Sequence, residues 1–376
     1  MLEKFCIKLV KNKVLFMSLV LILAAAFPFI FSSKYVLRIG IISLMYVMLA
    51  LSLNLMTGML GQMSFGHAAF WGIGAYTTAI LATRAGLPSE ITFILSAVMA
   101  GLFGAILGLP VLKLKGYYFT IVTMVFCEII RVVEINWMKL TRGPLGIMAI
   151  PKPAFFGLRI TSQRGFYFLI LILVILTAII IKNIMNSRIG YAVLAIRDDD
   201  LAAEAMGVNI FRYKLIIFIV SSMLAGVAGA FFAQYTGFID PSSFSGVQSN
   251  EMLVMVIFGG LGNMFGSFFG AITLSILPEL LRGFQQYRQL IYGMLLVLLM
   301  LVRPYGLFGS INFKYLAQKM NLSKAQIPVT GGAEHDRYLK SNRIKPALWR
   351  IGCFGKHKPS DTEGRDSRNN RTKWRR

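Results

Sequence analysis

Charged side chains are scarce in this sequence. Asp, Glu, Lys and Arg make up 15% of its 376 residues, whereas soluble domains usually carry about 25%. The hydrophobic residues, which account for 56% of the chain, stand in long blocks, and about 20 consecutive apolar residues are enough for a helix to cross a bilayer. The low charge excludes a globular enzyme with a water-exposed surface. The blocks predict membrane-spanning helices, which satisfy their own backbone hydrogen bonds in lipid.

Motifs for covalent chemistry and metal binding are also lacking. The three cysteines fit no CxxC or zinc spacing, and the three histidines form no HExxH pair. There is no GxSxG motif, no Ser-His-Asp arrangement and no P-loop GxxxxGK[ST]. We therefore expect no catalytic residue, metal or cofactor on this chain, and transport of a small solute is the preferred function.

Acidic residues are few, 16 against 39 basic ones, which gives a net charge of +23. No basic cluster alternates with aromatic residues, so nucleic acid is not an expected partner. Much of the excess lies beyond Arg303. We expect residues 311–376 to form a basic, disordered cytoplasmic tail, drawn toward anionic lipid headgroups by its charge.

The apolar blocks predict an all-α polytopic membrane protein of about ten transmembrane helices. Residues 1–13 are a cytoplasmic N-terminus, and residues 14–310 form the transmembrane domain, with an inner loop at 183–213. The expected spans are 14–31, 39–57, 64–83, 91–112, 118–134, 165–182, 214–235, 249–262, 263–281 and 288–303. The short eighth span and the glycine-rich stretch 58–72 are candidates for broken or re-entrant elements.

Lys and Arg in the connections favour an orientation with both termini inside. The first block follows a lysine-rich segment and is also compatible with a cleaved signal peptide. It is longer than the usual signal core of about 7–15 residues, so an uncleaved first helix is the preferred interpretation.

Polar residues gather at membrane depth in the glycine-rich stretch. They are Asn54, Gln62, Ser64 and His67. Such residues are costly in lipid unless they face a cavity or a partner helix, and glycines allow helices to break or approach closely. They are therefore candidates for a translocation path. The alternative is close packing with satisfied hydrogen bonds, which we prefer for His67.

A second group of polar residues lies in the block 118–134. Thr120, Thr123, Glu128, Arg131 and Glu134 share one broad helical face, and Glu128 can pair with Arg131 at i, i+3. These residues either line a path or form a buried ion pair that locks two helices.

The inner loop predicts a short amphipathic helix at 198–209. Asp198, Asp199 and Asp200 suit a helix start, and Gly207 suits its end. Between them Leu201, Ala202, Ala205 and Met206 form an apolar stripe. The stripe indicates docking of a soluble partner. The alternative, a helix lying flat on the membrane, is disfavoured by the three aspartates.

The run Phe258–Gly266 echoes Gly58–Gly66. The echo suggests a degenerate internal duplication, with both glycine-rich turns at the inner ends of spans.

Five segments together resemble one family. They are GQMSFGHAAFWGIGAYTTAIL (61–81), GYYFTIVTMVFCEIIRVV (116–133), SRIGYAVLAIRDDDLAAEAMGVN (187–209), GGLGNMFGSFFGA (259–271) and RPYGLFG (303–309). The family is the branched-chain amino acid ABC transporter permeases, of the LivM type in particular, and the resemblance covers roughly residues 38–310 in order and spacing.

This resemblance implies a multi-pass inner-membrane permease that translocates leucine, isoleucine or valine. It implies a second related permease subunit, two cytoplasmic subunits that bind ATP and Mg, and an extracytoplasmic substrate-binding protein. It also implies ATPase coupling by Arg197, Asp198, Asp199, Asp200, Ala203, Glu204, Ala205 and Gly207. The chain lacks the LP pair that ends the wider permease signature, and the tail matches no part of the family's core.

Other functions remain as alternatives. Permeases of the same family carry urea, amides or other amino acids. An ion-coupled secondary transporter would need no docking helix, and an intramembrane enzyme would need a catalytic set that the sequence lacks. A channel is the weakest alternative.

Overall fold

The computed structural model describes residues 24–29, 33–114, 116–155 and 157–280, together with 293, 294 and 297. All of them belong to one compact unit. The expected tail at 311–376 and most of the first and last expected spans, 14–31 and 288–303, lie outside the described residues.

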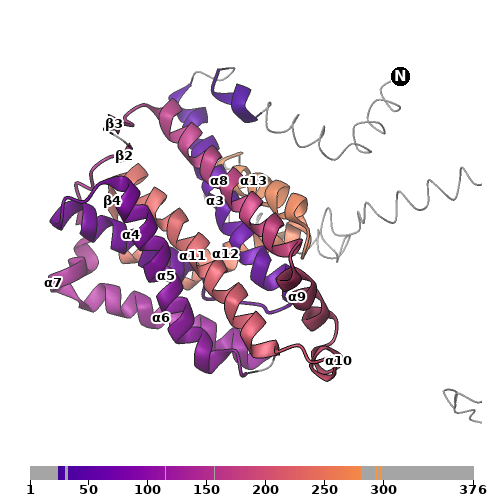
Figure 1. The fold of residues 1–376 in the computed structure, drawn as a ribbon. Coiled ribbons are helices and arrows are strands. Elements are labelled where there is room, and N and C mark those ends of the chain that lie inside the picture. The colour runs from indigo at the N-terminus through magenta and orange to yellow at the C-terminus, as the bar shows by residue number, and fades with distance from the viewer. Residues whose placement is uncertain are drawn as a thin grey trace, which may run out of the picture. The chain divides into compact units, whose positions relative to one another are not determined.

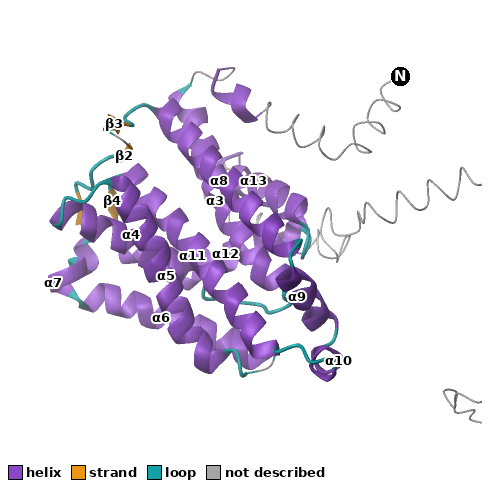
Figure 2. Cartoon of the chain, viewed as in Figure 1, coloured by secondary structure: helices purple, strands orange, loops and turns teal. Residues whose placement is uncertain are grey.

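The described part of the chain is built almost entirely of helices (Figure 2). The long ones are α3 (Lys34–Asn54), α4 (His67–Arg84), α5 (Ser89–Val111), α6 (Tyr117–Asn136), α8 (Gln163–Met185), α11 (Ile210–Thr236), α12 (Gly246–Gly259) and α13 (Met264–Leu280). A π-helical segment, η1 (Leu55–Met59), continues α3. These elements coincide with the eight expected spans between residues 39 and 281, so the sequence prediction of helices there is confirmed.

Four of these helices are long and apolar enough to cross a membrane. They are α3 with η1 (Lys34–Met59), α5, α8 and α11. The others are shorter or carry more charge, and α12 has only 14 residues. A polytopic, mostly helical chain is therefore what the structure supports, while the number of ten crossings stays a prediction.

Helix α11 lies at the centre of the bundle, against α4, α5 and α3 (Figure 1). Small residues allow this close contact. A Cβ on Gly229 of α11 would lie 2.1 Å from the Trp71 carbonyl oxygen of α4, and one on Gly226 would lie 2.7 Å from that of Ser96 in α5. Backbone thus packs on backbone, which positions these three helices closely. Helix α3 packs in turn against α8, α12 and α13.

Short strands and turns connect the helices at the end of the bundle opposite the inner loop (Figure 1). β1 (Ile147–Met148) pairs antiparallel with β4 (Phe238–Ile239), and β2 (Ala154–Phe155) pairs with β3 (Leu158–Arg159). The helices α7 (Met138–Thr141), η2 (Gly143–Leu145) and η3 (Pro241–Phe244) belong to the same region. The β1–β4 pair joins the loop after α6 to the end of α11.

Candidate functional site

The inner loop folds as two helices, not the one that the sequence predicted. Ser187 caps α9 (Arg188–Asp198), since its Oγ accepts a hydrogen bond from Ile189 N. Asp199 caps α10 (Asp200–Ala205), since its Oδ1 accepts from Leu201 N at 2.9 Å and from Ala202 N at 3.1 Å. The predicted helix start at the aspartates is confirmed for Asp199, which is the cap, and for Asp200, the first residue of α10. It is wrong for Asp198, which ends α9.

The other two aspartates form ion pairs. Asp198, the last residue of α9, pairs with Arg197 at 3.1 Å. Asp200, the first residue of α10, pairs at 2.9 Å with Lys214 of α11, whose side chain is only 8% exposed. A buried ammonium needs a partner, so Asp200 fastens α10 to the first turns of α11. Ala203 is buried on the same side.

The apolar stripe of α10 is exposed. Leu201 is 70% and Met206 85% exposed, and Ala202 and Ala205 are also exposed. Gly207 then ends the helix with φ +82°, a conformation that favours glycine. Exposed contiguous apolar surface marks an interaction site more often than an isolated apolar residue does. The stripe has the exposure that docking requires, and docking itself stays a prediction.

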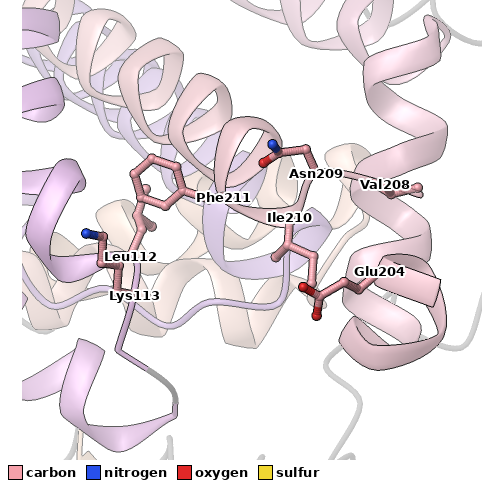
Figure 3. A pocket seen from close by; sticks show the side chains of 7 residues that line it. All are labelled: Leu112, Lys113, Glu204, Val208, Asn209, Ile210 and Phe211. Atoms are coloured by element: carbon pink, nitrogen blue, oxygen red, sulfur yellow. The ribbon is translucent and has the colours of Figure 1, made fainter. Parts of the chain in front are cut away.

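A pocket of about 320 Å³ lies beside α10 (Figure 3). It is formed by the inner end of α5, by Glu204 and by the segment that leads into α11. Its lining residues are Leu112, Lys113, Glu204, Val208, Asn209, Ile210 and Phe211. The predicted coupling residue Glu204 is exposed and lines this pocket. The apolar stripe of α10 therefore lies next to a pocket lined by both polar and apolar side chains.

The two glycine-rich turns lie side by side. Asn54 is buried at the end of α3, and its Oδ1 accepts a hydrogen bond from Gly262 N at 2.9 Å. A Cβ on Gly58 would lie 2.2 Å from the same nitrogen. The structure therefore brings together the two segments whose sequences echo one another. Asn54 holds one turn against the other.

Arg197 of α9 lies against both turns. A Cβ on Gly61 would lie 2.9 Å from Arg197 Cγ, and one on Gly262 would lie 3.3 Å from Arg197 Nη1. The inner loop and the two glycine-rich turns, which are far apart in the sequence, thus form one contiguous region.

The remaining polar candidates of the first turn are buried or half-buried. Ser64 is buried, and its Oγ accepts from Gly66 N at 3.3 Å. His67, the first residue of α4, is buried and shares a 2.7 Å hydrogen bond between its Nε2 and Ser52 Oγ of α3. Gln62 is half-buried. His67 thus has the predicted hydrogen-bonded packing.

The threonines of α6 fasten that helix to the same turn. Thr123 is buried, and its Oγ1 accepts from Phe65 N at 3.2 Å. Thr120 Oγ1 donates to the Met63 carbonyl at 3.1 Å. In this structure both side chains therefore bond the backbone of residues 63–65, which places α6 beside the turn.

Glu128 and Arg131 form the predicted ion pair, at 2.8 Å. Of the two predicted alternatives, a path-lining pair and a buried pair, the described chain does not show the buried one, because the side chains of Glu128 and Arg131 are 42% and 37% exposed. Glu128 Oε1 also accepts from Gly246 N, at the start of α12. The pair lies on a helix with much uncovered apolar surface, including Ile121, Met124, Val125, Ile129 and Val132, each about half exposed.

Two further groups lie near these candidates. Lys214 is not indicated by the sequence, because its partner Asp200 lies 14 residues away. Glu134 belongs to the predicted polar face of the helix with Glu128 and Arg131. It is 5% exposed, both its carboxylate oxygens lack a hydrogen-bond partner among the described residues, and Gly72 leaves room for it.

Comparison with known proteins gives a consistent result. Residues 35–302 match the family described as "Branched-chain amino acid transport system / permease component". The chain is 37% identical over 321 residues to the high-affinity branched-chain amino acid transport system permease protein LivM of Escherichia coli K12, covering 79% of this chain and 75% of that protein.

More distant relatives agree. Identity is 24% over 291 residues to LivH of Salmonella typhimurium, covering 70% of this chain and 91% of that protein. It is 23% over 313 residues to a probable LivM of Methanocaldococcus jannaschii, covering 70% and 90%. No solved structure matches significantly. The family match covers the described helices, both glycine-rich turns and the inner loop, and the chain therefore belongs to the family of permease components of branched-chain amino acid transport systems.

Proposed function

We propose that this chain is the membrane permease subunit of an ATP-binding cassette importer that carries leucine, isoleucine and valine. Family membership and the 37% identity to LivM support the permease role and the substrate class. The proposal that ATP-binding subunits drive the import rests on the exposed apolar stripe of α10. The Asp199 cap and the Asp200–Lys214 ion pair hold this helix in place.

The stripe is proposed to receive one of two cytoplasmic ATP-binding subunits. Leu201 and Met206 would enter an apolar groove on that subunit, as amphipathic helices commonly do. Glu204 and the neighbouring pocket would contribute polar contacts at its edge. ATP and Mg would bind only on the partner, since this sequence has no P-loop.

The uncovered face of α6 is proposed to meet the second, related permease subunit. A carboxylate and a guanidinium at mid-helix are costly against lipid, and the Glu128–Arg131 pair is about 40% exposed on the described chain. A partner permease with water between the subunits would remove that cost. The path for the solute would then run along this interface.

The pair also suits the proposed substrate. A branched-chain amino acid carries an ammonium and a carboxylate, which complement Glu128 and Arg131, while its side chain matches the apolar neighbours on α6. An extracytoplasmic binding protein would deliver the substrate at the end of the bundle that carries the short strands. In this arrangement the chain crosses the inner membrane about ten times with both termini inside.

The proposal is tested by uptake in vesicles. The chain is co-expressed with a LivH-type permease and the ATP-binding subunits, reconstituted, and supplied with binding protein and labelled leucine. Uptake should require ATP inside and should be inhibited by isoleucine and valine more than by urea or phenylalanine. Uptake that follows an ion gradient without ATP would refute the importer, and preferential competition by urea or phenylalanine would refute the substrate class.

A further inference from the structure

Arg197 stands between the docking helix and the two glycine-rich turns. It is the last but one residue of α9, and only Asp198 and Asp199 separate it from α10. Its side chain packs against Gly61 and Gly262, with Cγ 2.9 Å from the Cβ position of Gly61 and Nη1 3.3 Å from that of Gly262. The exposed stripe for docking is on α10. Arg197 therefore faces the helix bundle through these contacts, and not only the cytoplasm.

The two glycines form a seat that fits this side chain. Gly61 has φ +81° and Gly262 has φ +77°, backbone conformations that residues with a Cβ rarely adopt. Without side chains of their own, both turns leave room for the stem and the guanidinium of Arg197. The Asp198 carboxylate accepts from Nη2 at 3.1 Å and from Nε at 3.3 Å, which holds the guanidinium in orientation.

The turns are connected to the transmembrane helices. The turn containing Gly61 follows α3 and η1, and the turn containing Gly262 joins α12 to α13. The Asn54–Gly262 hydrogen bond ties them together. A displacement of this pair of turns would therefore act on α3, α12 and α13 at once.

The junction between α9 and α10 is also held by hydrogen bonds. Asp199 caps α10 directly after α9, and its backbone nitrogen is bonded to the Ala195 carbonyl of α9. When a partner pushes or pulls α10, the end of α9 has to follow. Arg197, near the end of α9, is the side chain that lies against both turns.

We infer that Arg197 is a positioning residue that transmits movement of α10 to the paired turns at Gly61 and Gly262, and so links ATP hydrolysis to opening of the path. This inference rests on the proposed function. It assigns Arg197 a role distinct from docking, which belongs to the α10 stripe. Loss of the side chain should leave the partner bound but separate its ATP hydrolysis from transport.

The test compares Arg197→Ala and Arg197→Lys with Arg188→Ala in the reconstituted complex. Arg188 is the first residue of the same helix and is exposed, so it is a matched control for removing a cation from α9. Three quantities are measured: ATP-binding subunit retained on purification, ATP hydrolysed, and leucine imported. The number of ATP molecules hydrolysed per leucine is the readout that a simple loss of folded protein does not change.

For Arg197→Ala we expect normal retention of the ATP-binding subunit and about a tenfold rise in ATP per leucine, a size typical of coupling between sites. Arg197→Lys keeps the aliphatic stem on Gly61 and should recover part of the coupling. Arg188→Ala should behave as the wild type. A wild-type ratio in Arg197→Ala would overturn the inference, and loss of the ATP-binding subunit would show a docking role instead. Failure of the proposed function looks different, because the wild-type complex would then show no ATP-dependent uptake.

Discussion

The ion pair between Asp200 and Lys214 gives a prediction whose size follows from burial. Lys214 is 8% exposed and Asp200 33% exposed, so the two partners differ in access to water. Removing one partner of a buried pair costs about 3–5 kcal/mol. In Asp200→Asn the ammonium stays buried beside a neutral amide, and partial access of water to the site lowers the expected cost to about 1–3 kcal/mol.

The cost should appear as local opening of α10. Since about 1.4 kcal/mol corresponds to a factor of ten, amide protection in residues 201–206 should fall roughly tenfold to a hundredfold on hydrogen exchange. The centre of α11 should keep its protection, because its contacts with α4 and α5 are untouched. Mass spectrometry of the purified complex measures both regions in one experiment.

The different burial of Lys214 and Asp200 predicts different effects of substituting each of them. Lys214→Met removes the buried charge and leaves a carboxylate that water reaches, so its effect should be smaller than that of Asp200→Asn. Asp198→Asn is the control, because Asp198 is 72% exposed and exposed pairs contribute about 0–1 kcal/mol. Equal effects of Asp200→Asn and Lys214→Met, or full protection in Asp200→Asn, would refute the reasoning.

Two other predictions concern glycines. Gly207→Val forces a β-branched residue to φ +82° at a cost of about 1–3 kcal/mol. Leucine uptake and retention of the ATP-binding subunit should therefore fall while the chain still inserts. The control is Gly86→Val, which is also at positive φ in open space but lies between α4 and α5, and it should leave retention unchanged. Gly229→Leu places a side chain 2.1 Å from the Trp71 carbonyl oxygen, so this variant should fail to accumulate in membranes. Val227→Leu, at a half-buried position of the same helix, should accumulate normally. Immunoblots of membrane fractions measure both amounts.

Helix positions were predictable because apolar length is a local property of the sequence. Each expected span between residues 39 and 281 is helical in the structure. The same logic was available for α9, where Gly190, Val193 and Ile196 recur at three-residue steps and are buried. The three aspartates after α9 give a stronger helix-start signal, and such a signal does not indicate a helix that precedes it.

Contacts across the fold were not predictable in the same way. Asn54 and Gly262 are 208 residues apart in the sequence, and the echo between their segments indicated a relation without placing one against the other. Glu128 and Arg131 show the converse. Their pairing follows from helical spacing. Their exposure depends on which other elements cover α6, and a single sequence does not reveal those elements.

Retention of the ATP-binding subunit by a variant of the α10 stripe bears most directly on the proposed ATP-driven import. In Leu201→Lys with Met206→Lys, two exposed apolar side chains become charged, so the chain should insert normally yet lose the ATP-binding subunit and ATP-dependent leucine uptake together. Leu145→Lys, which charges a side chain 68% exposed in η2, is the control for docking and should retain the ATP-binding subunit. Normal retention and uptake in the double variant would contradict docking on α10.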